Sequence, residues 1–313
     1  WYEKYIQKEA AHKFLKQKKV KLVPNGIVVV DNAPEFTHPD LAPILKKDKN
    51  GKPIFWAWNK KKLQLRDHGT HVSCLAGGYR NGKGVDGVAA SNSYIIPLIV
   101  RYNNRHTIFA SDVAIGLHYL LRLEKEGKIF FRVVNMSFSM HNSKIVFSAM
   151  KILDNKLFVV AAGNSQQNLD LDKEYYPAAW DLPNKITIAA IEDNDRLAYF
   201  SNYGSKSVSL AAPGVDILSC VSGGGYKTFA GTSMASPLVA GATSLLVSID
   251  PYAKVRRIKN VLFHTANTPK SLKEKVKNGR RLNVNSAVRY LWFITRKHKN
   301  TRRREHKNMK TKK

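Results

Sequence analysis

Apolar runs alternate with amphipathic segments along most of the chain. The runs are rich in β-branched residues and carry apolar side chains at successive positions, which is typical of strands buried on both faces. Alternation of such strands with helical segments predicts an α/β fold with three layers, in which a mostly parallel central sheet has helices on both faces. The predicted strands are residues 26–31, 94–100, 131–138, 157–163, 185–191 and 207–214, and the predicted helices are 71–78, 110–127, 142–153 and 233–249.

The two ends of the chain differ from this pattern. Residues 1–25 read as a basic helical lead-in, and the apolar spacing of 254–266 and 283–294 predicts two closing helices. Residues 295–313 are strongly basic, with Lys or Arg at ten of 19 positions, which predicts a disordered tail. We therefore expect one domain over residues 1–294, followed by this tail.

Composition narrows the class of protein. Hydrophobic residues make up 43% of the 313 residues, which is enough for a sizeable core. No run approaches the ~18 apolar residues of a membrane span, so we expect no transmembrane segment. The net charge of +29 indicates either a polyanion partner, such as nucleic acid or an acidic surface, or a solvated lysine-rich surface. Cys74 and Cys220, the two cysteines, form either one disulfide or two buried thiols.

The stretch GTSMASP, residues 231–237, places small hydroxyl residues directly before an apolar helical run. One interpretation is a helix cap, since Ser and Thr accept hydrogen bonds from the first free amides of a helix. The other is a nucleophilic serine held at the positive end of the helix dipole. This stretch alone does not decide between them.

Polar residues at the ends of predicted strands favour the nucleophile. Asp31 ends one strand, Asn164 follows another, and His68 lies in the sequence DHGTH before a helix. Because binding and catalytic residues of parallel sheets lie at the carboxyl ends of the strands, we expect these side chains to lie close together. The chain order Asp31, His68, Ser233 is one of the orders known for hydrolase triads, and Asn164 carries an amide suited to an oxyanion hole.

Together these segments resemble the subtilisin-like serine proteases, the subtilase family (peptidase family S8). The resemblance covers most of residues 1–294, and HGTH and GTSMASP are its most specific motifs. Its matching segments are residues 30–31, 38–41, 68–72, 135–137, 161–164 and 231–241.

The resemblance implies a serine endopeptidase that works through an acyl-enzyme. Ser233 would be the nucleophile, His68 the general base, and Asp31 the carboxylate that orients the imidazole. Asn164 and the backbone N–H of Ser233 would stabilise the oxyanion, with Ser236 an ordinary helix cap. Two alternatives remain: a catalytically weakened pseudoprotease that binds peptides, and a polyanion-binding protein that acts through its basic tail.

The resemblance also implies an extended polypeptide substrate that pairs with residues 135–140. An N-terminal propeptide, acting as inhibitor and folding chaperone, is a further implied partner, and a secreted or cell-envelope location is favoured. Asp170, Asp172 and Glu174 would either favour a basic substrate residue or be solvated loop acids. The expected substrate-binding residues are Ser137, Phe138, Ser139, Gly163 and Tyr175.

The chain departs from the family pattern next to its catalytic residues. Asn32, Ala33 and Pro34 follow Asp31 where Ser or Thr and then Gly are usual, and we expect Asn32 to donate a hydrogen bond to the carboxylate. Cys74 stands where the family has Gly, and Leu238 where it often has His. The chemistry needs no cofactor, but structural calcium is common in the family. Asp40 and Asn81 fall where some members supply oxygen ligands to that ion.

Overall fold

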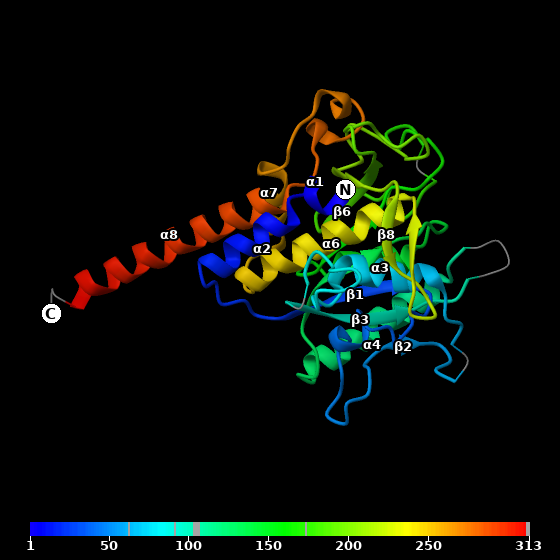
Figure 1. Cartoon of the computed structure of the whole chain (residues 1–313), viewed down its shortest axis with the longest axis horizontal. Coiled ribbons are helices and arrows are strands. Elements are labelled where there is room, and N and C mark those ends of the chain that lie inside the picture. The colour runs from blue at the N-terminus through cyan, green and yellow to red at the C-terminus, as the bar shows by residue number, and fades with distance from the viewer. Residues whose placement is uncertain (62, 91, 103–106, 173, 311–313) are drawn as a thin grey trace.

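The computed structural model describes residues 1–61, 63–90, 92–102, 107–172 and 174–310, with side chains described as far as residue 297 (Figure 1). Its centre is a seven-stranded sheet of order β2-β3-β1-β4-β5-β6-β7, in which every neighbouring pair is parallel. The strands are β1 (Asn25–Asp31), β2 (Trp56–Ala57), β3 (Ser93–Ile99), β4 (Phe131–Met136), β5 (Leu157–Ala161), β6 (Lys185–Ile191) and β7 (Leu210–Pro213).

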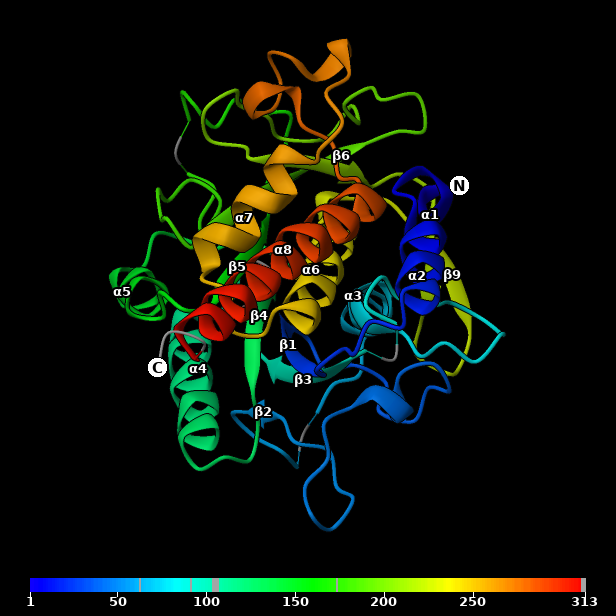
Figure 2. The same cartoon turned by 90° about the vertical axis from the view of Figure 1, so that its left-hand side faces the viewer.

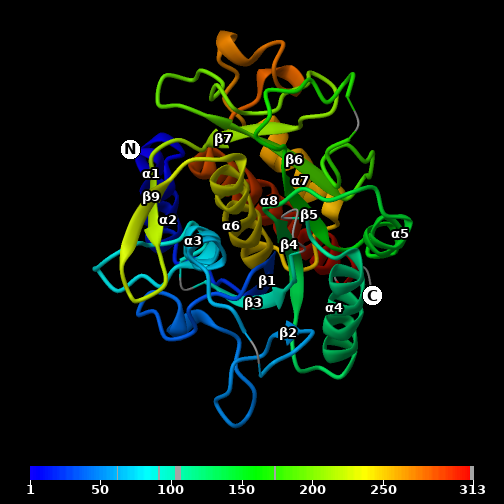
Figure 3. The same ribbon diagram turned by 90° about the vertical axis from the view of Figure 1, so that its right-hand side faces the viewer.

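Alternate residues of these strands bury into two separate cores. On β1, Ile27 and Val29 contribute to one core, and Val28 and Val30 to the other. Figures 2 and 3 show the helices distributed on both faces of the sheet. The predicted three-layer α/β fold is confirmed. The first core packs against α2 (Lys8–Gln17), α3 (Asp67–Gly77), α6 (Thr232–Ile249), α7 (Val255–His264) and α8 (Val284–Lys310), and the second against α4 (Ala110–Lys125) and α5 (Lys144–Ile152).

Helix α6 runs through the centre of the first core. Within the described residues it is the one helix long and apolar enough to cross a membrane by length and composition, and 89% of it is buried inside the fold. A helix that is apolar on all sides is buried in a large protein as well as in a bilayer. Packing against the sheet therefore accounts for its composition.

Three short strands were not predicted. β2 pairs with β3 at the sheet edge, and β8 (Ile217–Cys220) and β9 (Tyr226–Phe229) form an antiparallel hairpin outside the main sheet. The hairpin turn passes through Gly223 and Gly224 at φ +85° and +79°, a conformation that glycine adopts without a steric penalty. Strands this short carry too few residues for a period of two to be recognised.

The ends of the chain are helical. The lead-in forms α1 (Tyr2–Tyr5) and α2, which lies against α8. Helix α8 continues past residue 295 to Lys310 and projects from the body (Figure 1), so the predicted disordered tail is wrong as far as Lys310. The packed first half supplies the nucleus, and Arg, Lys and Glu are good helix formers that extend it at little cost. Residues 311–313 lie outside the described part of the chain.

Candidate active site

The carboxylate of Asp31 holds the His68 ring at the carboxyl end of β1. His68 Nδ1 lies 2.9 Å from Asp31 Oδ1 and 3.0 Å from Oδ2. Because an ionised carboxylate only accepts hydrogen bonds, Nδ1 carries the proton and donates it. Asp31 is fully buried, whereas the His68 side chain is 33% exposed toward the cleft. This arrangement fixes the tautomer that leaves Nε2 as the acceptor.

The same carboxylate sets the charge preference of His68. Burial of the ring favours its neutral form, but the negative charge and hydrogen bond of Asp31 outweigh it and raise the pKa of His68 above its ordinary value. Protonation of the imidazole is therefore made easier at this position, as a general base requires.

Helix α3 is held tightly against the loop after β1. A Cβ on residue 69 would lie 2.3 Å from the backbone oxygen of Asn32, so only glycine fits there. Gly69 N donates to Asn32 Oδ1 at 2.9 Å, while the backbone N of Asn32 donates to Asp31 Oδ1 at 2.8 Å. The Asp31 carboxylate thus accepts a hydrogen bond from the backbone of Asn32. The side chain of Asn32, which we expected to donate one, holds the start of α3 instead.

Ser233 lies in the first turn of α6, two residues after Gly231. Gly231 has φ +156°, at the edge of the region that L side chains rarely adopt. Ser233 Oγ donates to Ser137 O at 3.1 Å, and Ser137 Oγ donates to Ser233 O at 3.0 Å. Among the hydrogen bonds of the described residues, none joins Ser233 Oγ to His68; catalytic hydrogen bonds are often absent or long before substrate binds.

Ser236 does not cap α6. Its buried hydroxyl donates to Asn135 Oδ1 at 2.8 Å and approaches Val159 O at 3.2 Å. These contacts tie the second turn of α6 to β4 and β5 beneath the serine. The predicted cap is wrong because the side chain faces the sheet, away from the free amides of the helix start.

Asn164 is oriented by Thr232. Asn164 Oδ1 accepts hydrogen bonds from Thr232 N at 2.9 Å and from Thr232 Oγ1 at 2.8 Å. With its oxygen occupied, the amide presents Nδ2 as the donor on the cleft side. Thr232 was missed as a positioning residue, although its place directly before Ser233 in GTSMASP was a signal for it.

One pocket of about 380 Å³ brings the predicted catalytic and substrate-binding residues together, except that buried Asp31 lies behind His68. Asp170, Asp172 and Glu174 do not line it, and Asp170 instead accepts a backbone bond from Ser207 at 2.8 Å. The lining residues that the sequence did not single out as substrate contacts are Asn32, Arg66, Tyr102, Ala161, Ser165 and Thr232.

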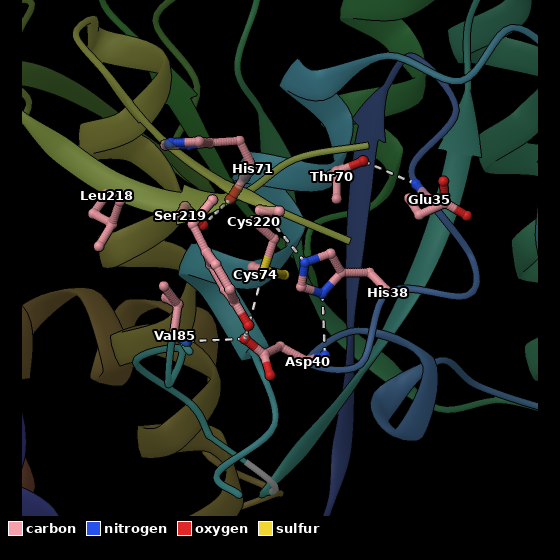
Figure 4. Close-up of a disulfide and its surroundings, with 12 residues drawn as sticks. Glu35, His38, Asp40, Thr70, His71, Cys74, Val85, Leu218, Ser219 and Cys220 are labelled. Carbon is pink, nitrogen blue, oxygen red and sulfur yellow. Dashed lines mark hydrogen bonds between the residues drawn. A yellow bond between two sulfur atoms is a disulfide. The ribbon is translucent and has the colours of Figure 1, made fainter. Parts of the chain in front are cut away.

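Cys74 and Cys220 form a disulfide (Figure 4), with Cα atoms 6.0 Å apart and a sequence separation of 146. Cys74 lies on α3, the helix that begins beside His68, and Cys220 ends β8. The bond therefore ties the histidine-bearing helix to the hairpin. Of the two alternatives left open by the sequence, the structure contains the paired cysteines.

The expected calcium ligands do not fit a cation. The buried Asp40 carboxylate accepts hydrogen bonds from Asn81 Nδ2 at 2.8 Å and Tyr226 Oη at 2.9 Å. It also accepts one from Val85 N at 2.9 Å (Figure 4). Asn81 Oδ1 accepts from Lys83 N at 2.7 Å. Calcium requires oxygens that point at the ion, whereas here N–H and O–H donors fill the space around the carboxylate. These hydrogen bonds hold residues 81–85 against Asp40 without a metal.

A second group of metal-ligating atoms surrounds the disulfide. His38, Cys74 and Cys220 place ligand atoms within 4.8 Å of one another, all of them buried. The sulfurs are bonded to each other, however, and both His38 ring nitrogens have backbone partners, Asp40 N at 3.1 Å and Gly225 O at 3.2 Å. This group therefore lacks free ligands for an ion.

Comparison with known proteins agrees with this geometry. A sequence model of the subtilase family matches residues 26–290, which include every residue of the pocket. The chain belongs to the subtilase family. The resemblance predicted from HGTH and GTSMASP is thereby confirmed.

Relatives of this subtilase include bacterial and apicomplexan proteins. It is 34% identical over 230 residues to a thermophilic serine proteinase of Bacillus sp. (strain AK1), covering 71% of this chain and 52% of the relative. It is 28% identical over 284 residues to subtilisin-like protease 2 of Plasmodium falciparum (isolate 3D7), covering 84% of this chain and 20% of that protein. The chain therefore spans about half of one relative and a fifth of the other.

Solved structures share the fold. The crystal structure of a cold adapted subtilisin-like serine proteinase superposes with a TM-score of 0.68 at 25% identity, over 85% of this chain and 90% of the other. The prenylagaramide maturation protease PagA gives a TM-score of 0.70 at 21% identity, over 90% and 98% of the two chains. The second likeness is one of fold alone.

Proposed function

We propose that this subtilase is a serine endopeptidase in which Ser233 forms an acyl-enzyme. The observation that carries the proposal is the His68 ring, held by both oxygens of Asp31 and exposed to a pocket that Ser233 and Asn164 also line. A serine needs a base to become nucleophilic, and the base needs a carboxylate to hold its tautomer. These requirements meet in one pocket.

The chemical steps follow from the atoms that each residue leaves available. Rotation of the Ser233 side chain away from Ser137 O turns Oγ toward His68 Nε2, which takes the hydroxyl proton as Oγ attacks a peptide carbonyl. Asn164 Nδ2 and the Ser233 backbone N–H donate to the oxyanion that forms. The imidazolium then protonates the leaving amine, and water hydrolyses the ester by the same sequence of proton transfers.

The proposed substrate is an extended polypeptide. Ser137, Phe138 and Ser139 line the cleft without pairing to another strand within the described residues, so their backbone groups are placed to pair with a bound chain. Tyr175 bounds the pocket close to Gly163, where a Cβ on residue 163 would lie 3.2 Å from the ring. Since Asp170, Asp172 and Glu174 lie outside the lining, we propose no basic preference.

The structure around Ala33, where the sequence departs from the family pattern, favours an active protease over a pseudoprotease. Ala33 is buried and pairs with Leu65, and the Asp31–His68 geometry beside it is intact. The methyl group of Ala33 therefore displaces neither Asp31 nor His68 from their hydrogen bond.

Hydrolysis of an unfolded protein substrate tests the proposal. Native protein should release peptides from casein, and Ser233→Ala and His68→Ala should each lower kcat by at least about 10³-fold while leaving the circular-dichroism spectrum unchanged. Native protein that is folded but releases no peptides, or a Ser233→Ala variant as active as native, would overturn it.

We also propose that the protein works in a compartment that permits disulfides, because the chain pairs its two cysteines. Protein taken from its source and alkylated without reductant should carry no added mass at Cys74 or Cys220. Alkylation of both would contradict this location.

A further inference from the structure

The described chain buries three lysines, and one of them has no carboxylate partner. Lys8 is 1% exposed and bonds to Glu3 at 2.7 Å, and Lys156 is 1% exposed and bonds to Glu124 at 2.5 Å. Lys185 is 7% exposed, yet within the described residues no carboxylate lies at ion-pair distance from it. A buried ammonium is normally paired, so this exception requires an explanation.

The polar contacts of Lys185 are neutral and incomplete. Its Nζ donates to Ala178 O and, at 2.6 Å, to Thr187 Oγ1. An ammonium has three N–H donors, and these two acceptors carry no net charge. The charge of Lys185 is thus solvated by dipoles alone.

Further lysines surround the same position. Lys185 opens onto a pocket of about 380 Å³ that is also lined by Lys206, Lys259 and Lys277, with Asp181 as its one acidic residue. Within the described chain none of these lysines has an ion-pair partner, and Lys259 Nζ donates only to the backbone oxygens of residues 183 and 185, at 2.6 and 2.9 Å. Four cations against one carboxylate give the pocket a strong positive potential.

The pKa values show the cost of this arrangement. Burial and then the nearby charge of Lys259 lower the pKa of Lys185 to about 7, with Asp181 opposing them. Burial and then the charge of Lys277 lower the pKa of Lys259. Each lysine therefore makes its neighbour harder to protonate, and an anion between them would relieve the repulsion.

We infer that this pocket, lined by Lys185, Lys206, Lys259 and Lys277, binds a small, multiply charged oxyanion of the phosphate class. Oxyanions accept several N–H and O–H donors at once, and Ser207 and Ser209 add hydroxyls to the ammonium groups of the lining. The volume is at the lower end of the range for small-molecule sites, which suits a phosphate, a pyrophosphate or a small phosphate ester. The site is separate from the catalytic cleft, with which it shares no lining residue.

Isothermal titration calorimetry on the full chain tests the site, with pyrophosphate and sulfate as probes at constant ionic strength. Native protein should bind both at millimolar concentration or below. The Lys259→Ala/Lys277→Ala variant, which alters side chains at the pocket edge, should bind at least about tenfold more weakly. Lys254→Ala, on the exposed surface beside α7 but outside this pocket, is the matched control and should bind as native does.

Lys185→Met supplies a test specific to the buried charge. Methionine has a similar shape without the ammonium, so this variant should keep the fold and lose the binding. Sulfate keeps its double charge between pH 6 and 8, so a change in its affinity reports on the protein. Because Lys185 loses its proton near pH 7, sulfate should bind up to about tenfold more weakly at pH 8 than at pH 6.

Three results would overturn the inference: no heat of binding for either anion, equal loss of binding in Lys254→Ala, or unchanged binding in a folded Lys259→Ala/Lys277→Ala variant. The second would show that the anion responds to the net charge of the surface instead of to a site. None of these readouts involves peptide hydrolysis, so they stand or fall separately from the proposed protease activity.

Discussion

Reduction of the Cys74–Cys220 disulfide should destabilise the fold strongly. The bond closes a loop of 146 residues between α3 and β8, and restriction of the unfolded chain by such a loop is worth about 5 kcal/mol. Native domains are stable by only about 5–15 kcal/mol, so its loss removes a large share of the total. Helix α3 also carries His68, so reduction should loosen the Asp31–His68 pair together with the hairpin.

Urea unfolding followed by circular dichroism measures this effect, with the Ser233→Ala variant used throughout to prevent self-digestion. Treatment with a phosphine reductant, or the double change Cys74→Ala/Cys220→Ala, should lower the free energy of unfolding by about 3–5 kcal/mol. EDTA is the matched treatment. It should leave the free energy unchanged, because protein donors occupy the Asp40 carboxylate.

A loss below about 1 kcal/mol, with thiol titration confirming full reduction, would refute the reasoning about the disulfide. A large loss in EDTA would instead show that the protein binds a stabilising metal. The two treatments therefore distinguish stabilisation by the disulfide from stabilisation by a bound metal.

Three more substitutions test individual titratable groups and hydrogen-bond donors. Asp31→Asn should lower kcat by about 10⁴-fold. In the native protein, activity should fall on the acid side with a midpoint above about pH 6.5, because the raised pKa of His68 keeps the base protonated there. In the variant, the residual activity should fall at a lower pH, because the carboxylate that raises this pKa is gone. Asn164→Ala should lower kcat by about 10²–10³-fold with little change in KM, the loss seen when this donor is removed from a subtilisin, where the figure was measured. Burial lowers the pKa of His71 to about 4, so below about pH 6.5 the unfolded chain binds a proton at this residue that the native protein does not bind. The free energy of unfolding should therefore fall by about 3 kcal/mol as the pH drops from about 6.5 to 4. In His71→Phe, measured by the same urea titration, that part of the pH dependence should disappear, and an unchanged slope would contradict the assignment.

The long elements and the meeting of the candidate catalytic residues at one site could be predicted because their signals are local. The strand at 185–191 has the bounds of β6, and the helix predicted from 233 to 249 differs from α6 by one residue. Asp31, His68, Asn164 and Ser233 each lie within a short motif, so their types and order suggested one site before their distances were known.

Features that depend on contacts between distant segments could not be predicted. The pairing of Cys74 with Cys220 spans 146 residues, and neither cysteine lies in a motif that names its partner. Asn81 has an oxygen that suits calcium, but the folded loop turns its amide nitrogen toward Asp40. Residue type alone does not say which of the two atoms points inward.

Lys185 illustrates the same limit. In the run KITIAAI it reads as the polar end of a strand, where a lysine is ordinarily solvated. Its burial follows from the packing of residues 178–182 and of α7 over the start of β6, elements that the sequence does not place relative to one another.

Labelling with a serine-directed fluorophosphonate tests the central claim most directly. Such probes react with a serine only when a neighbouring base activates it. Intact-mass measurement should show one adduct on native protein, located at Ser233 by peptide mapping, and none on Ser233→Ala. Folded native protein without an adduct, or an adduct that persists in Ser233→Ala, would contradict the assignment of Ser233 and His68 as nucleophile and base.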